Sequence, residues 1–475
     1  MRRTYSLAAS VALLLLGQHA GLTAQNLLVH GGTVVTSEGS FEADVLVRAG
    51  VIAAVGRDLS AESGVRRIDA SGLLVLPGGV DPHVHLGGRW VDDYRTGSMA
   101  ALAGGITTIS NFASAGRGSD LTEVIDRQAD LIAQQAIADV ILHTTINDPE
   151  AHAPQMEALA ATGQTSIKIF MNFGGFDPNA SAFLQMIAAA GDAGVLTMIH
   201  AEDASILANQ AAELEAQGRT SVAYQPEARP VLAEEVAMMR AVAMAEQTGS
   251  PVYAVHVSSE RALRVAQAAR ARGLPFFIET RPIYLHLTRE RFDGPDAGLY
   301  VGQPPLREQS DQDALWEALA NGTIDVVGTD HVAYSREDKL DPSQTITNHR
   351  AGMNHLQMLR PLLFSDGVLT GRISVERFVE VTATNPAKLF GIFPEKGTIA
   401  VGSDADLVLW DPEETRTVRD QDMFSATGFS IYAGWEVTGW PVVTLRRGEV
   451  VFEGGEITGQ AGTGRLLERS RWEER

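Results

Sequence analysis

The sequence predicts an α/β protein in which a (β/α)8 barrel of the TIM type carries a small β-sandwich domain built from both chain ends. Three observations lead to this prediction. Residues 76–393 alternate apolar, β-rich runs with helical patterns, which is typical of a parallel sheet. Residues 25–75 and 394–455 both contain short strands separated by turn signals. No Gly-rich phosphate turn follows an early strand, which disfavours the alternative of a doubly wound open sheet.

The composition excludes several classes of protein before any motif is considered. The chain has 475 residues, of which 45% are hydrophobic, so there is enough apolar material for a core and intrinsic disorder is excluded. It contains no cysteine, which excludes a disulfide scaffold and a thiolate metal site. The formal net charge is −21, and an acidic surface repels phosphate backbones, so no nucleic-acid partner is expected.

Residues 1–24 have the pattern of a signal peptide that is removed from the mature chain. Arg2 and Arg3 form a basic start, residues 7–17 are an apolar run, and Ala24 offers a small residue at the cut. The run is shorter than the ~20 residues that a membrane-spanning helix needs, so no stable membrane span is expected. A buried N-terminal helix is the alternative. We therefore expect an exported, periplasmic or extracellular protein, secreted by the Sec route or, given the paired arginines, by the twin-arginine route.

The predicted strands of the small domain alternate with turns and show no helical period. They are residues 27–29, 33–35, 45–47 and 51–53 near the N-terminus, and residues 406–409, 441–445 and 449–452 near the C-terminus. Because two similar strand-rich segments enclose a different middle, we expect them to form one domain. The last segment, residues 456–475, is polar and charged and is expected to be a mobile tail.

One unit of the predicted barrel shows how helix and strand follow each other. Pro230 can begin a helix, because its missing N–H is not needed in the first turn. Residues 231–247 are rich in good helix formers, and Gly249 ends the helix. Residues 251–256 are then an apolar, β-rich run that ends in a histidine. Similar strand runs cover residues 74–80, 106–109, 166–170, 195–200 and 324–330.

Six polar side chains lie at or near the ends of these strand runs, where parallel barrels build their active sites. They are His83, His85, Lys168, His200, His256 and Asp330. Taken singly, each has a structural explanation: a hydrogen-bonded core histidine, a lysine whose amine reaches solvent, or an aspartate that caps a helix. Four imidazoles and a carboxylate are hard to place together without a cation, so the combination predicts a metal site.

Lys168 is the informative member of the group, because it lies in the middle of an apolar strand. Burial lowers the pKa of a lysine, so a neutral fraction of the amine is reachable. A neutral amine beside metal cations can react with carbon dioxide to give an anionic carbamate, whose two oxygens can bridge two metals. His83 and His85 share one face of their strand, as a pair of metal ligands requires.

The motifs that contain these residues resemble the cyclic amidases of the amidohydrolase superfamily, and most of all the dihydropyrimidinase and D-hydantoinase branch. These motifs are Asp81–Leu86, Ser166–Met171, His200–Glu202, Val255–Ser259 and Gly328–His331. Further similarity covers Glu279–Thr280, Pro304–Arg307, Thr384–Ala387, Gly402–Asp406 and Gly434–Val437. The resemblance extends over residues 26–455, and it implies the same barrel that the alternating pattern predicts.

The resemblance implies a centre of two divalent metal ions, expected to be zinc. His83 and His85 would share one ion with Asp330, the other two histidines would hold the second, and Lys168 with its CO2-derived carbamate would bridge them. It further implies that Asp330 is the catalytic general base. A metal-bridging hydroxide would hydrolyse the C–N bond of a small-molecule cyclic amide, such as a dihydropyrimidine or a hydantoin. Family members often form dimers or tetramers, so a homo-dimer or homo-tetramer is expected.

The residues expected to bind the substrate depart from the resemblance in part. The branch has a tyrosine five residues after the bridging lysine, which donates to the developing oxyanion, whereas this chain has Phe173, which cannot donate. Losing one such donor typically costs ~10²–10³ in rate. Asn172 is expected to point away from the site, because it is next to Phe173 in an alternating strand. His143 and His331 are candidate substitutes at strand ends, although a structural role is expected for each.

Two further substrate-binding positions are expected to act through the main chain. Asn348 matches a family residue that contacts the ring through its backbone, and Gln303 replaces a serine whose contact is also made by the main chain. Changes of side chain at these positions are therefore compatible with the same contacts.

Two alternative functions remain open from the sequence alone. Phe173 and the expected export favour an exported binuclear metallohydrolase of open-chain amides, such as a dipeptidase or an N-acyl amino acid deacylase. The second alternative is a non-enzymatic homologue, but such homologues have lost metal ligands, whereas all six positions are retained here.

Overall fold

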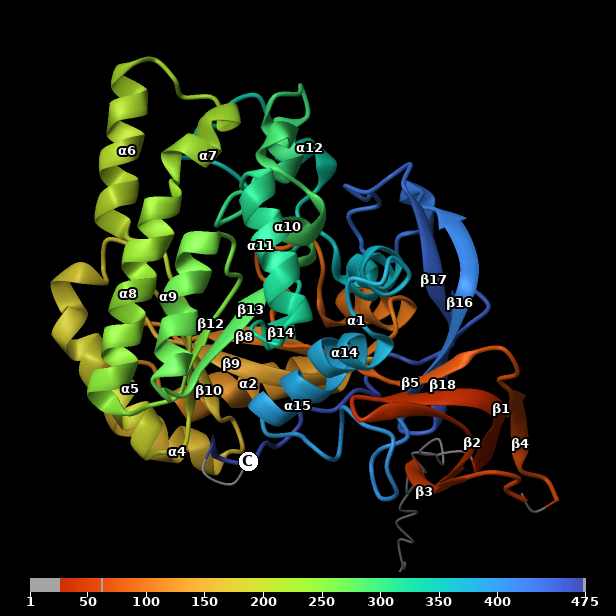
Figure 1. The fold of residues 1–475 in the computed structure, drawn as a ribbon. Helices are drawn as coiled ribbons and strands as arrows, with labels where there is room; N and C mark the ends of the chain where they lie inside the picture. The colour runs from red at the N-terminus through yellow and green to blue at the C-terminus, as the bar shows by residue number, and fades with distance from the viewer. Residues whose placement is uncertain (1–25, 61–62, 473–475) are drawn as a thin grey trace, which may run out of the picture.

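Two sheets organise the part of the chain that the computed structural model describes, residues 26–60 and 63–472. An eight-stranded sheet forms the barrel, and a nine-stranded sheet, here called the end sheet, is built from both chain ends. Figure 1 shows the barrel and its helices beside the end sheet, where red N-terminal and blue C-terminal strands meet. The predicted fold class is confirmed. The predicted signal peptide lies outside the described residues.

The barrel strands follow one another in chain order, and every hydrogen-bonded pair is parallel. They are β6 (Gly79–Asp81), β8 (Ile106–Ser114), β9 (Asp139–Thr145), β10 (Ser166–Phe170), β11 (Leu196–His200), β12 (Val252–Ala254), β13 (Phe276–Thr280) and β14 (Val326–Val327). The short parallel pair β7 (Val84–His85) and β15 (His331–Val332) joins the two edges at the carboxyl end. Thr329 strengthens this closure, because its main-chain N–H and its hydroxyl donate to the carboxylate of Asp81 at 3.1 and 2.6 Å.

Helices alternate with the barrel strands and cover the outside of the barrel (Figure 1). The longer ones are α1 (Tyr94–Ala103), α2 (Leu121–Gln135), α5 (Ala180–Asp192), α6 (Ala204–Ala216), α8 (Val231–Thr248), α9 (Glu260–Ala271) and α11 (Gln309–Ala320). The shorter ones are α3 (Pro149–His152), α4 (Met156–Ala161), α7 (Gln225–Ala228), α10 (Pro282–His286), α12 (Arg336–Lys339), α13 (Leu359–Leu363), α14 (Val375–Val379) and α15 (Asn385–Leu389). As predicted, α8 follows Pro230 and ends at Gly249, which has a left-handed φ of 69°.

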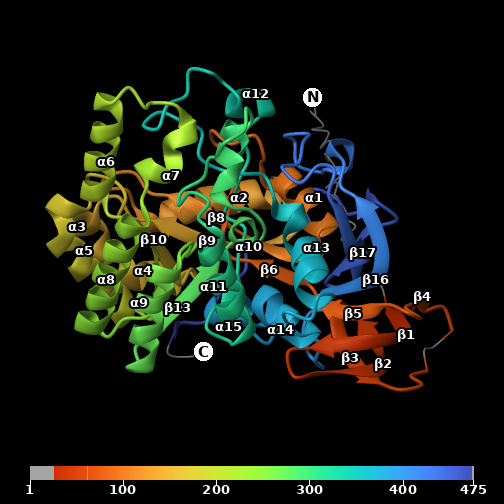
Figure 2. The same cartoon turned by 45° about the horizontal axis from the view of Figure 1, so that its top comes forward.

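The end sheet has the strand order β19-β18-β17-β16-β5-β1-β2-β3, with β4 paired to β1. The strands are β1 (Leu27–Thr36), β2 (Gly39–Arg48), β3 (Val51–Gly56), β4 (Arg66–Asp69), β5 (Leu74–Pro77), β16 (Leu407–Thr417), β17 (Glu436–Arg446), β18 (Glu449–Glu453) and β19 (Glu456–Ile457). Figure 2 shows β5 where the N-terminal and C-terminal strands meet. This pairing is why two distant segments of the sequence form one unit.

The first barrel strand is shorter than the sequence suggests. Residues 74–80 are one apolar run, but the structure divides them between β5 of the end sheet and β6 of the barrel. Gly78 makes the change of sheet possible, since a Cβ at this position would lie 2.1 Å from the hydroxyl oxygen of Thr107. An apolar run therefore shows that a strand is buried, but not which sheet it joins.

The C-terminal segment packs against the barrel as far as residue 472, so the expectation of a mobile tail is wrong for the described residues. Leu467 is 7% exposed and joins Phe390 in an apolar cluster that includes residues of the barrel strands. Arg469 is buried and donates to the hydroxyl of Ser166 and the carbonyl of Leu142 at 2.8 and 2.6 Å. The polar composition misled the prediction, because a few apolar residues and one buried arginine hold the segment.

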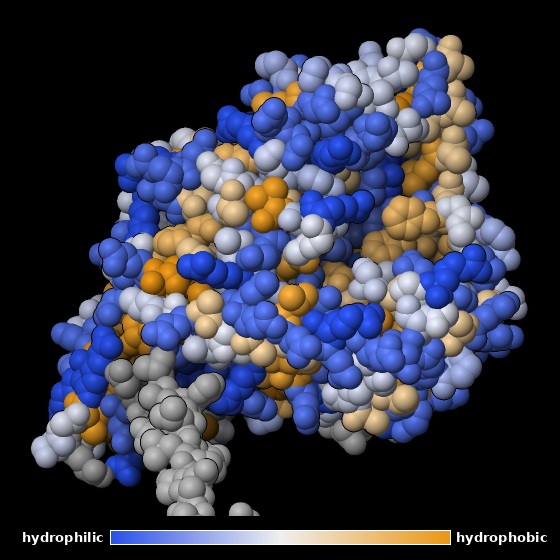
Figure 3. All heavy atoms as spheres, turned by 180° about the vertical axis from the view of Figure 1, so that it is seen from behind, coloured by the Kyte–Doolittle hydropathy of each residue, from blue (hydrophilic) through white to orange (hydrophobic). Residues whose placement is uncertain are grey.

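The face of the protein opposite the view of Figure 1 is mostly hydrophilic. Figure 3 shows hydrophobic residues scattered in small groups among hydrophilic ones on that face, as is usual for folded chains. Within the described residues, no helix has both the length and the apolar character that crossing a membrane requires.

A buried ion cluster joins the barrel to the end sheet. The amine of Lys396 lies 2.7 Å from Asp139 at the start of β9, 2.8 Å from Asp404 and 2.9 Å from Asp406 just before β16. Burial alone would raise the pKa of Asp139, but Lys396 and Arg447 outweigh it and hold that pKa well below its usual value. The ionised form of Asp139 is therefore favoured in the folded state.

We expect Lys396→Met to lower the free energy of unfolding by about 3–5 kcal/mol near neutral pH, because the buried carboxylates lose their cation. The stability that Asp139 draws from its depressed pKa is present above the ordinary aspartate pKa of about 4, and it is lost as the pH falls toward the lower folded-state pKa. The difference from the wild type should therefore shrink below about pH 4. Urea unfolding near neutral pH and below about pH 4 measures this difference in the free energy of unfolding. Lys388→Met, at an exposed position of α15, is the control, and an equal difference at both pH values would contradict the account.

Candidate active site

One cavity at the carboxyl end of the barrel collects all six residues that the sequence analysis proposes as metal ligands. Its volume is about 860 Å³. Its lining includes the six candidate ligands His83, His85, Lys168, His200, His256 and Asp330. They come from five different barrel strands or from the residues directly after them, so the closure of the barrel brings them together.

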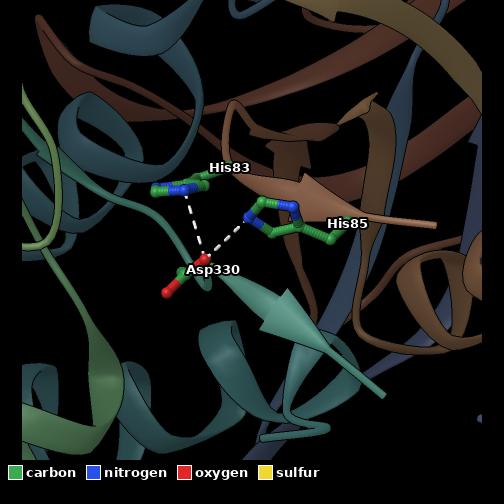
Figure 4. A group of neighbouring side chains, drawn as sticks. All are labelled: His83, His85 and Asp330. Atoms are coloured by element: carbon green, nitrogen blue, oxygen red, sulfur yellow. Dashed lines mark hydrogen bonds and ion pairs between the residues drawn. The ribbon is translucent and has the colours of Figure 1, made fainter. Parts of the chain in front are cut away.

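His83, His85 and Asp330 form a group that a single metal ion could join. Figure 4 shows both imidazole rings directed at the carboxylate. The Nε2 atoms of His83 and His85 lie 3.2 and 3.0 Å from Oδ1 of Asp330, and the ligand atoms of the three residues lie within 4.8 Å of one another. Nδ1 of His83 lies 2.7 Å from Oε1 of Glu279, which leaves Nε2 for an ion.

His200 and His256 form a second pair beside the first. Nε2 of His256 lies 2.9 Å from Nδ1 of His200, and the rings of His83 and His256 are stacked with 5.5 Å between their centroids. Nε2 of His200 is held by Glu202 at 2.7 Å, so Nδ1 faces the partner histidine. Burial lowers the pKa of all four histidines, and a neutral imidazole is the form that can bind a metal.

The amine of Lys168 is buried in the same cavity without a hydrogen-bond partner among the described residues. It lies 5.3 and 5.1 Å from the ring centroids of Phe112 and Phe170. Burial lowers the pKa of Lys168 to about 8, against the opposing effect of Asp330. An unpaired buried amine with a reachable neutral form fits a position that is completed by a further group.

The backbone at two of these residues supports a functional role. His256 and Asp330 have φ angles of 43° and 49°, in the left-handed region that residues other than glycine seldom adopt. Each lies just after a barrel strand, where this conformation turns the chain and directs the side chain into the cavity. Such strained residues gather at functional sites, because the surrounding structure must hold them in place.

Arg281 contacts Asp330 and was not singled out by the sequence analysis. Its side chain is fully buried, Nη1 lies 3.1 Å from Oδ2 of Asp330, and Nε donates to the carbonyl of Thr329 at 3.0 Å. Burial alone would raise the pKa of Asp330, but Arg281 and the neighbouring histidines outweigh it and hold that pKa well below its usual value. The available signal was an arginine directly after the buried strand β13.

Two buried glutamates orient the histidines, although the sequence analysis gave neither a role. Glu279 also accepts hydrogen bonds from the hydroxyl of Tyr253 and the main-chain N–H of His256, each at 2.9 Å. Nε of Arg229 donates to Glu202 at 3.0 Å. Burial alone would raise the pKa of Glu202, but Arg229 outweighs this effect and the pKa falls to about 2. A charged residue inside an apolar run, as in β13, is the signal that could have identified Glu279.

The predicted substrate-binding residues are placed differently from one another. Phe173 and Gln303 line the cavity, and Phe173 is 59% exposed. Asn348 is not among the lining residues that the structure describes, because its main-chain N–H and carbonyl bond to Thr345 within a turn. Its neighbour His349 lines the cavity instead, with Nε2 3.1 Å from Nε2 of Gln303.

Asn172 also lines the cavity, contrary to the expectation that it points away. Strand β10 ends at Phe170, so the alternation of a strand does not extend to residues 172 and 173. Nδ2 of Asn172 lies 3.5 Å from Oε1 of Gln303. The cavity therefore contains carboxamide groups on the side where Phe173 offers no polar atom.

His143 and His331 are occupied elsewhere and do not replace the missing donor. Nδ1 and Nε2 of His143 lie 2.6 and 2.9 Å from the hydroxyl of Ser166 and the carbonyl of Pro82. Nε2 of His331 lies 2.9 Å from Asp92, and its Nδ1 accepts two main-chain N–H groups. Both rings have structural roles, as the sequence analysis expects.

A parallel barrel whose carboxyl end gathers histidines and a carboxylate defines the class of metal-dependent barrel enzymes. Residues 74–451 match the amidohydrolase family, and the chain belongs to this family. It is 35% identical to a D-hydantoinase of Ralstonia pickettii over 94% of this chain and 100% of that protein.

Solved structures give the same result. The structure of a D-hydantoinase from Bacillus sp. AR9 is similar with a TM-score of 0.90 and 36% identity, over 94% of this chain and 99% of that chain. A dihydropyrimidinase from Brevibacillus agri NCHU1002 is similar with a TM-score of 0.90 and 35% identity, over the same shares of the two chains. The predicted resemblance to the hydantoinase and dihydropyrimidinase branch is confirmed.

Proposed function

We propose that this protein hydrolyses a C–N bond of a small-molecule cyclic amide, such as a hydantoin or a dihydropyrimidine. The observation that carries the proposal is that a chain 35% identical to a D-hydantoinase over nearly its whole length keeps six candidate ligands in one cavity. The alternative of an open-chain amidase has no support from these relatives. The most important departure from the hydantoinase branch is Phe173, which replaces the tyrosine of that branch.

We further propose that the cavity holds two divalent metal ions, which we expect to be zinc, and that a carbamate on Lys168 would bridge them. Two observations support a fit. Four imidazoles whose pKa burial lowers line one cavity with the carboxylate of Asp330. The buried amine of Lys168 has no hydrogen-bond partner among the described residues. Bound zinc ions would supply a nucleophile from water at neutral pH and polarise the amide carbonyl.

The side chains around the cavity have separate tasks in the proposed reaction. Asp330 accepts the proton of the attacking water and returns it to the leaving ring nitrogen. Arg281 holds Oδ2 of Asp330 and leaves Oδ1 directed at the histidines. Glu279 and Glu202 fix the orientation of His83 and His200, so the ligand atoms are in place before a substrate enters.

A substrate panel tests the proposed function. Purified, zinc-loaded protein is offered dihydrouracil, 5-substituted hydantoins, allantoin and N-acyl dipeptides, and ring opening or acyl release is followed by mass spectrometry. We expect turnover of at least one ring substrate and none of the dipeptides. Activity confined to the open-chain amides would replace the cyclic-amide proposal with its alternative, and a protein that binds no metal would refute both.

We expect Phe173→Tyr to raise kcat for a ring substrate by about 10-fold, because the added hydroxyl can donate to the oxyanion and one such donor is typically worth ~10²–10³ in rate. Steady-state kinetics on the best substrate of the panel measures this. Phe170→Tyr, which adds a hydroxyl to the neighbouring ring of the same cavity, is the control. No gain in Phe173→Tyr would show that this chain uses another donor, for which the carboxamide of Asn172 is available.

We also propose that the mature protein is exported, to the periplasm or the medium, and that it forms a homo-dimer or homo-tetramer. The paired arginines and the apolar run in residues 1–24 support export. The dimers and tetramers that family members often form support oligomerisation. Cell fractionation with and without residues 1–24 tests the first, and light scattering of the purified protein tests the second.

A further inference from the structure

The mouth of the cavity carries two arginines on a chain whose net charge is −21. Arg89 and Arg350 line the cavity, and within the described part of the chain neither side chain forms an ion pair or a hydrogen bond. Among the described residues of the lining, the only carboxylate is that of Asp330, which is already engaged by His85 and Arg281. Two cations without counter-ions at the entrance of an acidic protein call for an explanation.

Arg89 is held at the mouth by an aromatic neighbour. Its guanidinium carbon lies 4.1 Å from the ring centroid of Trp90, which in turn lies 6.0 Å from the ring of His85. A single side chain therefore separates Arg89 from the candidate metal centre. Stacking uses the flat face of the guanidinium and leaves its N–H edge available to an acceptor.

Arg350 reaches the mouth from a loop that a buried lysine anchors. The amine of Lys339 is enclosed and donates to the carbonyls of Val301, Arg350 and Gly352 at 2.8, 2.8 and 2.7 Å. The main-chain N–H of Arg350 also donates to Oε1 of Gln344 at 2.5 Å. The backbone of Arg350 is therefore fixed, while its side chain is exposed at the mouth.

Tyr334 lines the same cavity as the two arginines. It meets Trp90 edge-to-face, with 5.3 Å between the ring centroids. Arg89 and Tyr334 therefore pack against the same indole, and Arg350 lines the same cavity. Burial raises the pKa of Tyr334, and the positive charges of Arg89 and Arg350 oppose that rise. Asp338 is close enough to act on Tyr334 as well, but it forms no ion pair with either arginine among the described residues.

We propose that Arg89, Tyr334 and Arg350, here called the mouth cluster, bind a carboxylate that the substrate carries outside the amide being hydrolysed. The proposal rests on the proposed function and narrows it to ring amides with an acidic substituent. A guanidinium matches a carboxylate with two parallel N–H donors, and the tyrosine hydroxyl adds a third. The reacting amide would lie at the candidate metal centre while the mouth cluster holds the substituent.

The test compares two hydantoins that differ only in charge, one with a carboxyethyl substituent on its ring carbon and one with the corresponding carboxamide. With zinc-loaded wild-type protein, we expect calorimetry to give a Kd about 10-fold lower for the carboxylate, and we expect kcat/KM to follow through KM. Arg89→Met and Arg350→Met should each reduce this preference by about 3- to 5-fold, because they weaken binding of the carboxylate more than binding of the carboxamide. Added salt should weaken the preference of the wild type.

A matched control and the possible outcomes separate this proposal from the proposed function. Arg264→Met removes an exposed arginine of α9 and should keep the full preference. Equal binding of the two hydantoins, or an unchanged preference in both mouth variants, would overturn the anion site even if both rings are opened. If the carboxylate binds through the two arginines but neither ring is opened, the anion site stands and the proposed function fails.

Discussion

Lys168→Ala is expected to abolish metal loading and to lower kcat by at least about 10³-fold. A carbamate on Lys168 would offer two oxygens to the ions of both histidine pairs, which lie beside each other in the same cavity. Without it, the two proposed cations would face each other with no bridging anion, and their mutual repulsion would weaken the binding of both. Metal analysis of the wild type should give about two ions per chain.

The variant can be rescued only if the bridge is a carbamate. A short carboxylic acid such as propionate can supply the two missing oxygens, so partial recovery of metal content and activity is expected when it is added to Lys168→Ala. Lys388→Ala, on the exposed side of α15, should bind metal like the wild type with or without the acid. Full metal content in Lys168→Ala without any added acid would remove the lysine from the proposed centre.

Asp330→Asn is expected to lower kcat by about 10²–10⁴-fold, the usual contribution of a general base. The amide keeps an oxygen as acceptor for Arg281, so the buried guanidinium retains a partner and the fold should survive. KM should change much less than kcat, because the proton transfer occurs after the substrate has bound.

Two measurements distinguish the loss of a base from general damage. The thermal unfolding of Asp330→Asn should stay near that of the wild type, and Asp296→Asn, at an exposed position, should leave both kcat and stability unchanged. Wild-type kcat in Asp330→Asn would show that another group takes the proton.

The fold was predictable from the sequence because its signals are local. The helix α8 shows this most clearly, since Pro230, a run of helix formers and Gly249 mark its start, body and end within one short segment. The boundary between β5 and β6 was not predictable, because both strands are apolar and only the pairing with β1 and β16 or with β8 tells them apart. The prediction for the C-terminal segment failed for the same reason, because the partners of Arg469 are hundreds of residues away in the sequence.

The residues of the candidate site were predictable in kind, but their contacts were not. Histidines at the ends of apolar strands and a lysine within one are visible in the sequence, because such groups are seldom buried without a partner. The contact between Arg281 and Asp330 is not visible, since the two residues are far apart in the sequence and meet only when β13 pairs with β14. The direction of Asn172 was wrong because strand alternation does not describe the loop that follows β10.

The sequence by itself determined the alternation of strands and helices, the chemical identity of the six candidate ligands and the branch that the chain resembles, because all three are written in short segments of the chain. Only the tertiary structure decided which glutamates and arginines orient those ligands, and that Arg89, Tyr334 and Arg350 line one cavity. The physical reason is that these interactions depend on the direction of side chains from segments far apart in the sequence. The pairing of the barrel strands, such as β13 with β14 and β7 with β15, brings these segments together.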